Sequence, residues 1–212
     1  MTLKGRMPMH RRMRPAALAA LVLATISCGD VVRQGRAPVY LVINSLEGAP
    51  GSSTTFTTGM LLSDVLVLLT TPEPCTPTSP CPTVFNDSGR ASISIVPKDH
   101  TVAPTTNNQV TITRYHIQYT RADGRNTPGV DVPYPFDGAV TATIGGALPS
   151  AIIFEMVRHV AKEESPLVQL IQNPQIITTI ANVTFYGRDV TGNDVSVTGS
   201  ITIEFGNFGD TL

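Results

Sequence analysis

The sequence predicts an all-β protein, built as an antiparallel two-sheet sandwich of about eight strands with room for one short helix. Several segments alternate apolar and polar side chains, which is the period of a strand with one buried face. Turn-forming residues separate these segments, since the chain holds 17 Gly and 17 Pro. The chain also lacks Trp, and only 15% of its residues are charged. This composition is typical of extracellular β domains with frequent turns.

The first third of the chain predicts three strands. Residues 38–46 alternate apolar and polar side chains and form the first strand, and residues 47–59 form a loop rich in Gly, Ser and Thr. Residues 60–70 are a nearly continuous apolar run, which predicts a strand buried in the middle of a sheet. The sequence NDSG at residues 86–89 predicts a turn that leads into a strand over residues 91–96.

The middle of the chain contains a strand with a change of phase. Residues 110–120 alternate, but the apolar positions shift by one residue near Thr113 and Arg114. A β-bulge at that point keeps both halves facing the core. Residues 121–138 predict a long, turn-rich connection, and residues 139–144 alternate again as a further strand.

The last third contains one ambiguous segment and the clearest hairpin. Residues 151–160 fit a helix capped by Ser150 as well as a strand, and their β-branched content favours the strand. A single helical turn over residues 166–171 would then bridge the two sheets. Residues 175–186 and 195–205 predict a final hairpin.

Two segments resemble a known family of β-sandwiches. Residues 115–119 (YHIQY) with the turn at residues 121–124 (RADG), and residues 185–193 (FYGRDVTGN), are similar to strand-and-turn segments of fibronectin type III and other immunoglobulin-like bacterial domains. The resemblance covers about the last half of the chain and implies an immunoglobulin-like sandwich. The chain departs from the antibody type, because it has no core Trp and no cysteine pair between sheets.

The N-terminal segment predicts export. A basic opening without acidic residues is followed by apolar and small residues from 16 to 27, a run too short for a permanent membrane anchor. The ending at residues 24–28 (ATISC) resembles the lipobox of bacterial lipoproteins, although Thr25 stands where Leu is usual. Two alternatives remain open, namely an ordinary signal peptide cut near Ala24 and a short buried apolar helix.

The lipoprotein resemblance implies that Cys28 is acylated and becomes the new N-terminus. Several acyl chains hold a protein to a membrane far more firmly than one does. Gly29 follows the cysteine where an Asp would retain the protein in the inner membrane, which favours the outer membrane. The expected organisation is a signal peptide (1–27), a lipidated tether (28–37) and a β-sandwich domain (38–212).

Charge excludes one class of partner. All sixteen acidic residues follow Cys28, whereas five of the fifteen basic residues precede it, so the mature chain carries ten basic and sixteen acidic side chains. Its formal charge is then −6. Nucleic acid is not an expected partner, because phosphate contacts need clustered Lys and Arg.

Cys75 and Cys81 remain as a pair within a loop that contains five prolines. In an oxidising compartment this spacing predicts a small disulfide ring that braces a protruding loop. Redox activity or metal binding by the two thiols is the alternative.

A candidate calcium site lies in the turn of the final hairpin, where Asp189, Asn193 and Asp194 supply hard oxygen ligands. The alternative is that these residues simply form the turn. No other cofactor is expected. Further carboxylates from loops at the same end of the sandwich would be Asp87, Asp123 and Asp131.

No catalytic motif is present, and the chain is not expected to be an enzyme. His100, His116 and His159 are far apart, and no periodicity brings them together. The leading hypothesis is an envelope lipoprotein whose loops or sheet edges bind another envelope protein or cell-wall glycan. A structural spacer or assembly subunit is the second hypothesis. The third is a secreted hydrolase that uses Glu155, Glu163 and Glu164.

Overall fold

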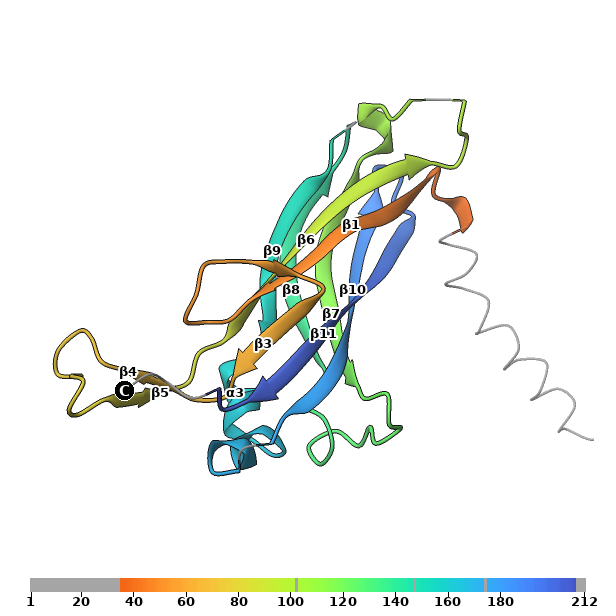
Figure 1. The fold of residues 1–212 in the computed structure, drawn as a ribbon. Coiled ribbons are helices and arrows are strands. Elements are labelled where there is room, and N and C mark those ends of the chain that lie inside the picture. The colour runs from red at the N-terminus through yellow and green to blue at the C-terminus, as the bar shows by residue number, and fades with distance from the viewer. Residues whose placement is uncertain (1–34, 102, 147, 174, 209–212) are drawn as a thin grey trace, which may run out of the picture.

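A computed structural model describes residues 35–101, 103–146, 148–173 and 175–208 of the chain (Figure 1). The predicted signal peptide, Cys28 and most of the predicted tether lie outside these residues. Within them, no helix is both long and apolar enough to cross a membrane. The described part is an all-β sandwich, as the alternation of apolar residues predicts.

Two sheets form the sandwich, and a small third sheet stands apart from them. The strand order is β2-β1-β6-β9 in the first sheet, β3-β11-β10-β7-β8 in the second and β4-β5 in the third. The first sheet contains β1 (Val39–Ala49), β2 (Thr57–Thr58), β6 (Asp87–Pro97) and β9 (Ser150–Val157). The second contains β3 (Met60–Asp64), β7 (Val110–Thr120), β8 (Phe136–Ile144), β10 (Ile177–Asp189) and β11 (Asp194–Gly206). The third pairs β4 (Val67–Leu69) with β5 (Cys81–Thr83).

The connectivity is immunoglobulin-like. The strands β1-β6-β9 have the order A-B-E of that fold, and β11-β10-β7-β8 have the order G-F-C-C′. The sandwich is antiparallel, as predicted, except at one edge, where β3 runs parallel to β11, with Met60 opposite Thr202. The chain passes from β2 of the first sheet to β3 at this edge of the second sheet through a single residue, Gly59.

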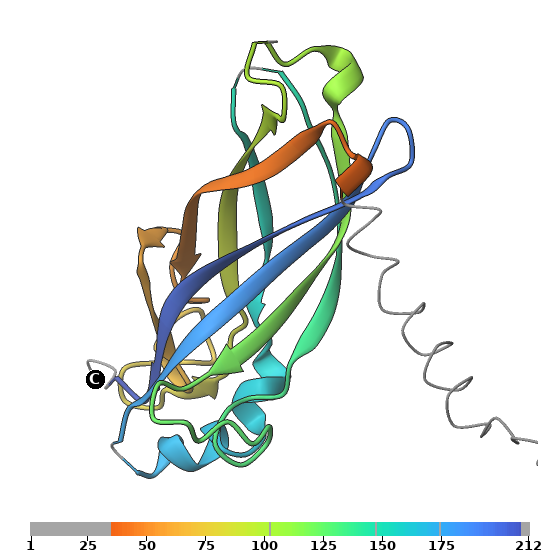
Figure 2. The ribbon, with the colours of Figure 1, turned by 90° about the vertical axis from the view of Figure 1, so that its right-hand side faces the viewer.

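Short helices close one end of the sandwich. The segment α3 (His159–Glu163) and the 3-10 helix η2 (Leu167–Ile171) connect β9 of the first sheet to β10 of the second. Figure 2 shows them at one end of the sandwich, with the turn between β10 and β11 at the other end. A further 3-10 helix, η1 (Thr106–Asn108), precedes β7. The helical turn expected over residues 166–171 is therefore confirmed.

Aromatic side chains fill the space between the sheets. Tyr115 packs against Phe154 with ring centroids 5.1 Å apart, and Phe154 packs edge-on against Phe185 at 5.2 Å. The Tyr119 hydroxyl, fully enclosed, donates to the Met156 carbonyl at 2.6 Å. These rings occupy the core of a chain that has no Trp.

Several local predictions are confirmed. The strand over residues 110–120 is β7, and its register shifts between Ile112 and Arg114, so the expected bulge lies at Thr113. The ambiguous segment is a strand, β9, up to Val157, and the helix begins only at His159. The final hairpin is the antiparallel pair β10 and β11.

The strand expected over residues 60–70 is wrong in length and position. Leu61 and Ser63 face the interior while Leu62 is exposed, so only one face of β3 is buried. The strand ends at Asp64, whose carboxylate accepts from the Leu66 amide at 3.3 Å, and lies at the edge of its sheet. Val65 stays in the core, and residues 67–69 leave the sandwich as β4.

The turn expected at residues 86–89 is also wrong, because β6 already begins at Asp87. Gly89 lies against Phe154, and a Cβ at this glycine would come within 2.5 Å of the ring. The glycine therefore allows close packing rather than a reversal of the chain. Asp87 is buried rather than exposed in a loop.

Candidate functional site

An arm built on β4 and β5 projects from the sandwich (Figure 1). We call residues 66–83 the braced arm. Its two strands pair antiparallel, with Leu69 opposite Cys81, and the chain between them forms its tip. Residues 71–74 and 77–79 of the tip are exposed.

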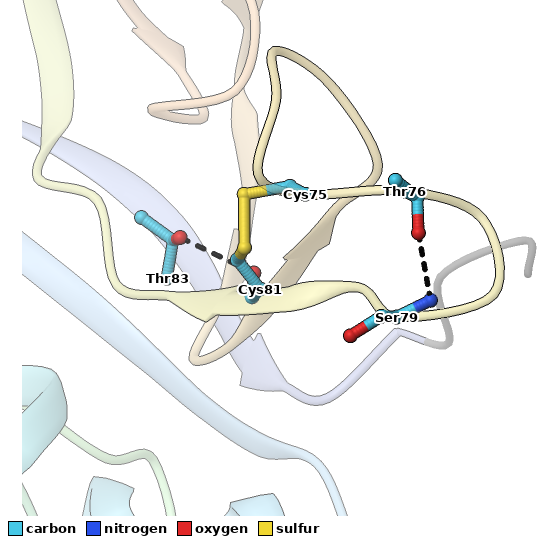
Figure 3. Close-up of a disulfide and its surroundings, with 5 residues drawn as sticks. All are labelled: Cys75, Thr76, Ser79, Cys81 and Thr83. Atoms are coloured by element: carbon cyan, nitrogen blue, oxygen red, sulfur yellow. Dashed lines mark hydrogen bonds between the residues drawn. A yellow bond between two sulfur atoms is a disulfide. The ribbon is translucent and has the colours of Figure 1, made fainter.

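A disulfide joins Cys75 to Cys81, as their spacing predicts (Figure 3). Inside the ring, Thr76 and Ser79 exchange two backbone hydrogen bonds of 3.0 Å each. The Thr76 hydroxyl also accepts from the Ser79 amide at 3.0 Å. Five prolines in the same loop restrict the backbone further. The tip is therefore held in one shape although it lacks a hydrophobic core.

The base of the arm carries an apolar strip. Residues 66–69 (LVLL) are four consecutive apolar residues, and all four are only half-buried. Apolar side chains on both faces of a short projecting strand leave surface that the sandwich does not cover. Loops with fixed shapes on rigid scaffolds commonly carry binding residues.

A buried polar cluster lies where β3, β6 and α3 meet. Lys162 Nζ lies 2.8 Å from Asp87 Oδ1, and the side chains are 1% and 0% exposed. Lys162 also donates to the Asp64 carbonyl at 2.8 Å. Ser63 donates to Asp87 Oδ2 at 2.5 Å, and the Gly51 amide donates to Oδ1 at 2.9 Å. The carboxylate therefore has partners on both oxygens.

The sequence does not indicate Lys162 or Ser63 as site residues, because Ser63 interrupts an apolar run and Lys162 lies in a connection between two predicted elements. A glycine is needed at position 51 of this cluster, because a Cβ there would lie 2.3 Å from the Asn86 carbonyl oxygen. Burial raises the pKa of the Asp87 carboxyl, against the opposing effects of Lys162, Ser63 and Gly51.

The candidate calcium residues form a hydrogen-bonded turn. Asp189 Oδ1 accepts from the amides of Thr191 and Asn193, and Oδ2 accepts from the Asn193 side chain, all at 2.8–2.9 Å. Asp194 pairs with Arg188 at 2.9 Å. No group of three potential metal ligands gathers in the described part of the chain. Calcium binding here stays a prediction, and the arrangement is that of a capped turn.

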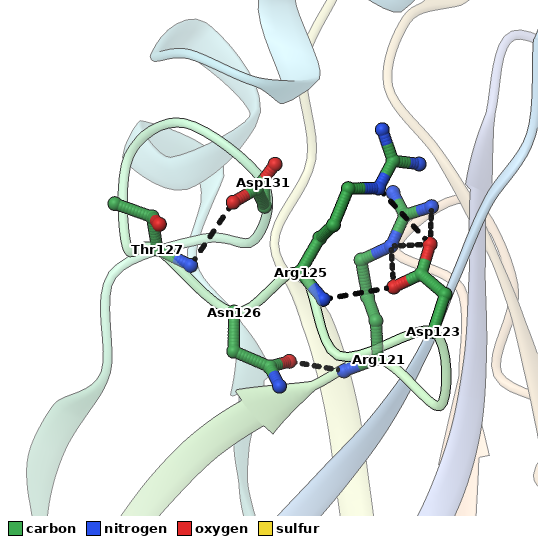
Figure 4. A network of polar contacts seen from close by, with 6 residues as sticks. All are labelled: Arg121, Asp123, Arg125, Asn126, Thr127 and Asp131. Atoms are coloured by element: carbon green, nitrogen blue, oxygen red, sulfur yellow. Dashed lines mark hydrogen bonds and ion pairs between the residues drawn. The ribbon is translucent and has the colours of Figure 1, made fainter.

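Asp123 and Asp131 do not lie near that turn, so the expectation of one shared loop cluster is wrong. In the pairing of β10 with β7, Asp189 lies opposite Val110, whereas the loop after Thr120 starts at the other end. Asp123 there binds Arg121 at 2.7 Å and Arg125 at 3.1 Å (Figure 4). Asp131 accepts from the Thr127 amide at 3.2 Å.

The residues considered for hydrolysis lie on β9 and at the end of α3. Glu163 ends α3 and Glu164 follows it, both exposed, and Glu155 is half-buried on β9. His100 and His159 are exposed, and His116 lies 3.3 Å from Asp137 on the outer face of β7. His159 and Glu163 share α3, whereas His116 lies on β7 and His100 follows β6.

One hollow on the outer face of the second sheet combines polar groups with a ring. It encloses about 520 Å³ near the β10–β11 turn. The Arg114 guanidinium covers the Tyr186 ring at 3.7 Å from its centroid. The remaining lining residues are Thr113, Gly187, Arg188, Asp194, Val195 and Ser196.

Comparison with known proteins gives no assignment: no family model matches the chain, and no curated protein matches its sequence.

Proposed function

We propose that the protein is a non-enzymatic lipoprotein, anchored in the bacterial cell envelope through Cys28, that presents its braced arm to another envelope protein. The observation that carries the proposal is the arm itself, a projecting hairpin that a disulfide and five prolines hold in shape. Such pre-organisation lowers the entropic cost of binding, because fewer conformations are lost when a partner docks.

The surface of the arm favours a protein as the partner. Residues 66–69 offer a half-buried apolar strip next to an exposed, polar tip. Protein interfaces commonly combine an apolar centre with a polar rim. The sandwich then acts as the rigid support that holds the arm away from the membrane.

The anchor is tested by lipid labelling. Cells that express the chain are grown with labelled palmitate, and we expect label on the purified protein. The variant Cys28→Ala should lose the label and appear in the soluble fraction. Label retained by this variant would contradict the anchor.

The arm is tested by photo-crosslinking in the native envelope. A photoreactive residue replaces Thr78 at the exposed tip, and a matched variant carries it at Thr141, an exposed position on β8. We expect a discrete adduct with a second protein from position 78 and none from position 141. Reduction of the disulfide, or the double variant Cys75→Ser/Cys81→Ser, should weaken the adduct.

Other outcomes separate the alternatives. Equal adducts from both positions, or none, would contradict a binding role for the arm. Adducts between two copies of this chain would favour an assembly subunit on the cell surface.

Cell-wall glycan is a second candidate ligand, favoured by the hollow beside Tyr186. Hydroxyl groups and the Arg114 guanidinium, which the Tyr186 ring supports, lie in one depression and are suited to sugar hydroxyls. Sedimentation with isolated cell-wall glycan tests this candidate. We expect the variant Tyr186→Ala to lose binding, whereas variants in the arm keep it.

A further inference from the structure

The buried pair of Lys162 and Asp87 can react in a way that a hydrated surface ion pair cannot. Both side chains are enclosed, with exposed fractions of 1% and 0%. An amine and a carboxyl group in contact can condense to an amide, but in bulk water hydrolysis and solvation of the ions oppose this. An enclosed site removes the ions from water, which favours uncharged species over charged ones.

We propose that the side chains of Lys162 and Asp87 join to form an intramolecular amide bond in the folded protein. Nζ lies 2.8 Å from Oδ1. Oδ1 is bonded directly to Cγ, the carbon that the amine must attack. The fold therefore supplies the proximity that a bimolecular condensation lacks.

The partners of the carboxyl group distinguish its two oxygens. Ser63 donates to Oδ2 at 2.5 Å, so this oxygen can carry the negative charge that develops when Nζ attacks Cγ. Oδ1 contacts both Nζ and the Gly51 amide, at 2.8 and 2.9 Å. Oδ1 is therefore the oxygen positioned to receive protons and leave.

The reaction balances without any co-reactant. Starting from the ammonium and the carboxylate, Nζ first gives a proton to Oδ1 and then attacks Cγ with the freed electron pair. The Nζ–Cγ bond forms, the Cγ–Oδ1 bond breaks, and Oδ1 departs as water with two of the three ammonium protons. The third proton stays on the amide nitrogen. This N–H can donate a hydrogen bond to the Asp64 carbonyl, whose oxygen already lies 2.8 Å from Nζ.

The bond would connect two distant parts of the chain. Asp87 opens β6 in the first sheet, and Lys162 lies in the helix that leads from β9 to the second sheet. The link would close the end of the sandwich where α3 packs. Burial of the carboxyl raises its pKa, which agrees with a group that reacts in its uncharged form.

Peptide mapping tests the proposal on the full chain purified from membranes. After reduction and denaturation, trypsin cuts the unlinked protein after Arg36, Arg90, Arg158, Lys162 and Arg188. With the amide present, we expect residues 37–90 joined to residues 159–188, uncut at position 162 and lighter than the two peptides together by the mass of one water. The free peptides 159–162 and 163–188 in full yield would overturn the proposal.

Two variants act as a matched pair. Lys162→Arg cannot form the amide and should restore both separate peptides. Lys98→Arg changes another lysine, which lies in contact with the Tyr40 ring, and should leave the linked peptide unchanged. The map of the unaltered chain decides the question even if Lys162→Arg does not fold.

Discussion

Two of the clusters in which a cation meets an aspartate have opposite surroundings. Asp87 and Lys162 are fully buried where β6 meets α3. Asp123 lies between Arg121 and Arg125 in the loop after β7, where the Asp123 and Arg125 side chains are 42% and 64% exposed. The first cluster joins segments that are 75 residues apart, and the second joins residues within one turn.

The pKa of the aspartate carboxyl shifts in opposite directions in these two clusters. Burial raises the pKa of Asp87, whereas the hydrogen bond from Arg121 leads the effects that hold the pKa of Asp123 below its usual value. Short ion pairs therefore do not all contribute equally to the stability of the protein. Solvent access and the length of chain between the partners decide what each pair contributes.

The largest expected effect is the removal of Lys162. The variant Lys162→Met fills similar volume but leaves the Asp87 carboxyl enclosed without its cation. Loss of one member of a buried ion pair costs about 3–5 kcal/mol, so we expect at least about 3 kcal/mol lower stability in urea unfolding. Where the proposed amide has formed, the variant loses that link as well.

A double-variant cycle tests the assignment of that loss to the pair. Asp87→Ala in the Lys162→Met background should cost much less than Asp87→Ala alone, because the two residues act as one unit. Independent, additive losses would show that the stability resides in packing around α3 rather than in the pair.

The sequence predicted most strands of the sandwich but not the buried cluster of Lys162 and Asp87. Alternation located β7 and β11, because a strand with one buried face has a period that side chains reveal locally, and the β-branched content of residues 151–160 favoured β9. The phase change at Thr113 even located a bulge. Asp87, in contrast, lies in the sequence Asn-Asp-Ser-Gly, which predicts a turn, and nothing local indicates a partner lysine 75 residues later.

The same distinction explains the arm. The spacing of Cys75 and Cys81 predicted the disulfide, because ring closure is local. The projection of β4 was not predicted, since an apolar run of that length is typical of a buried strand. Residues 67–69 pair with β5, with Leu69 opposite Cys81, and therefore lie outside the two main sheets.

An intermediate effect is expected at Asp189, which is buried but bound only to its own turn. Burial alone would raise the pKa of its carboxyl, but hydrogen bonds from Asn193 and Thr191 together hold the pKa below its ordinary value of 3.8. We expect Asp189→Asn to lower stability by about 1 kcal/mol at neutral pH.

The effect of Asp189→Asn should depend on pH with a definite sign. A lowered pKa in the folded state stabilises the protein above pH 3.8, and this contribution is lost as the pH falls through the folded-state pKa. The difference between the original chain and the variant, measured by urea unfolding, should therefore shrink in acid. A difference that grows in acid would contradict the role of the ionised carboxylate.

The smallest effect is expected at Asp123, although its pKa is also lowered and its contacts are short. Arg121 and Arg125 lie two residues away on either side, so the unfolded chain retains much of the same attraction. Water and salt also screen the exposed pair. We expect Asp123→Asn to leave the urea midpoint unchanged at both low and high salt. A shift as large as that of Asp189→Asn would show that the loop after β7 is coupled to the sandwich, and that exposure alone does not separate the two clusters.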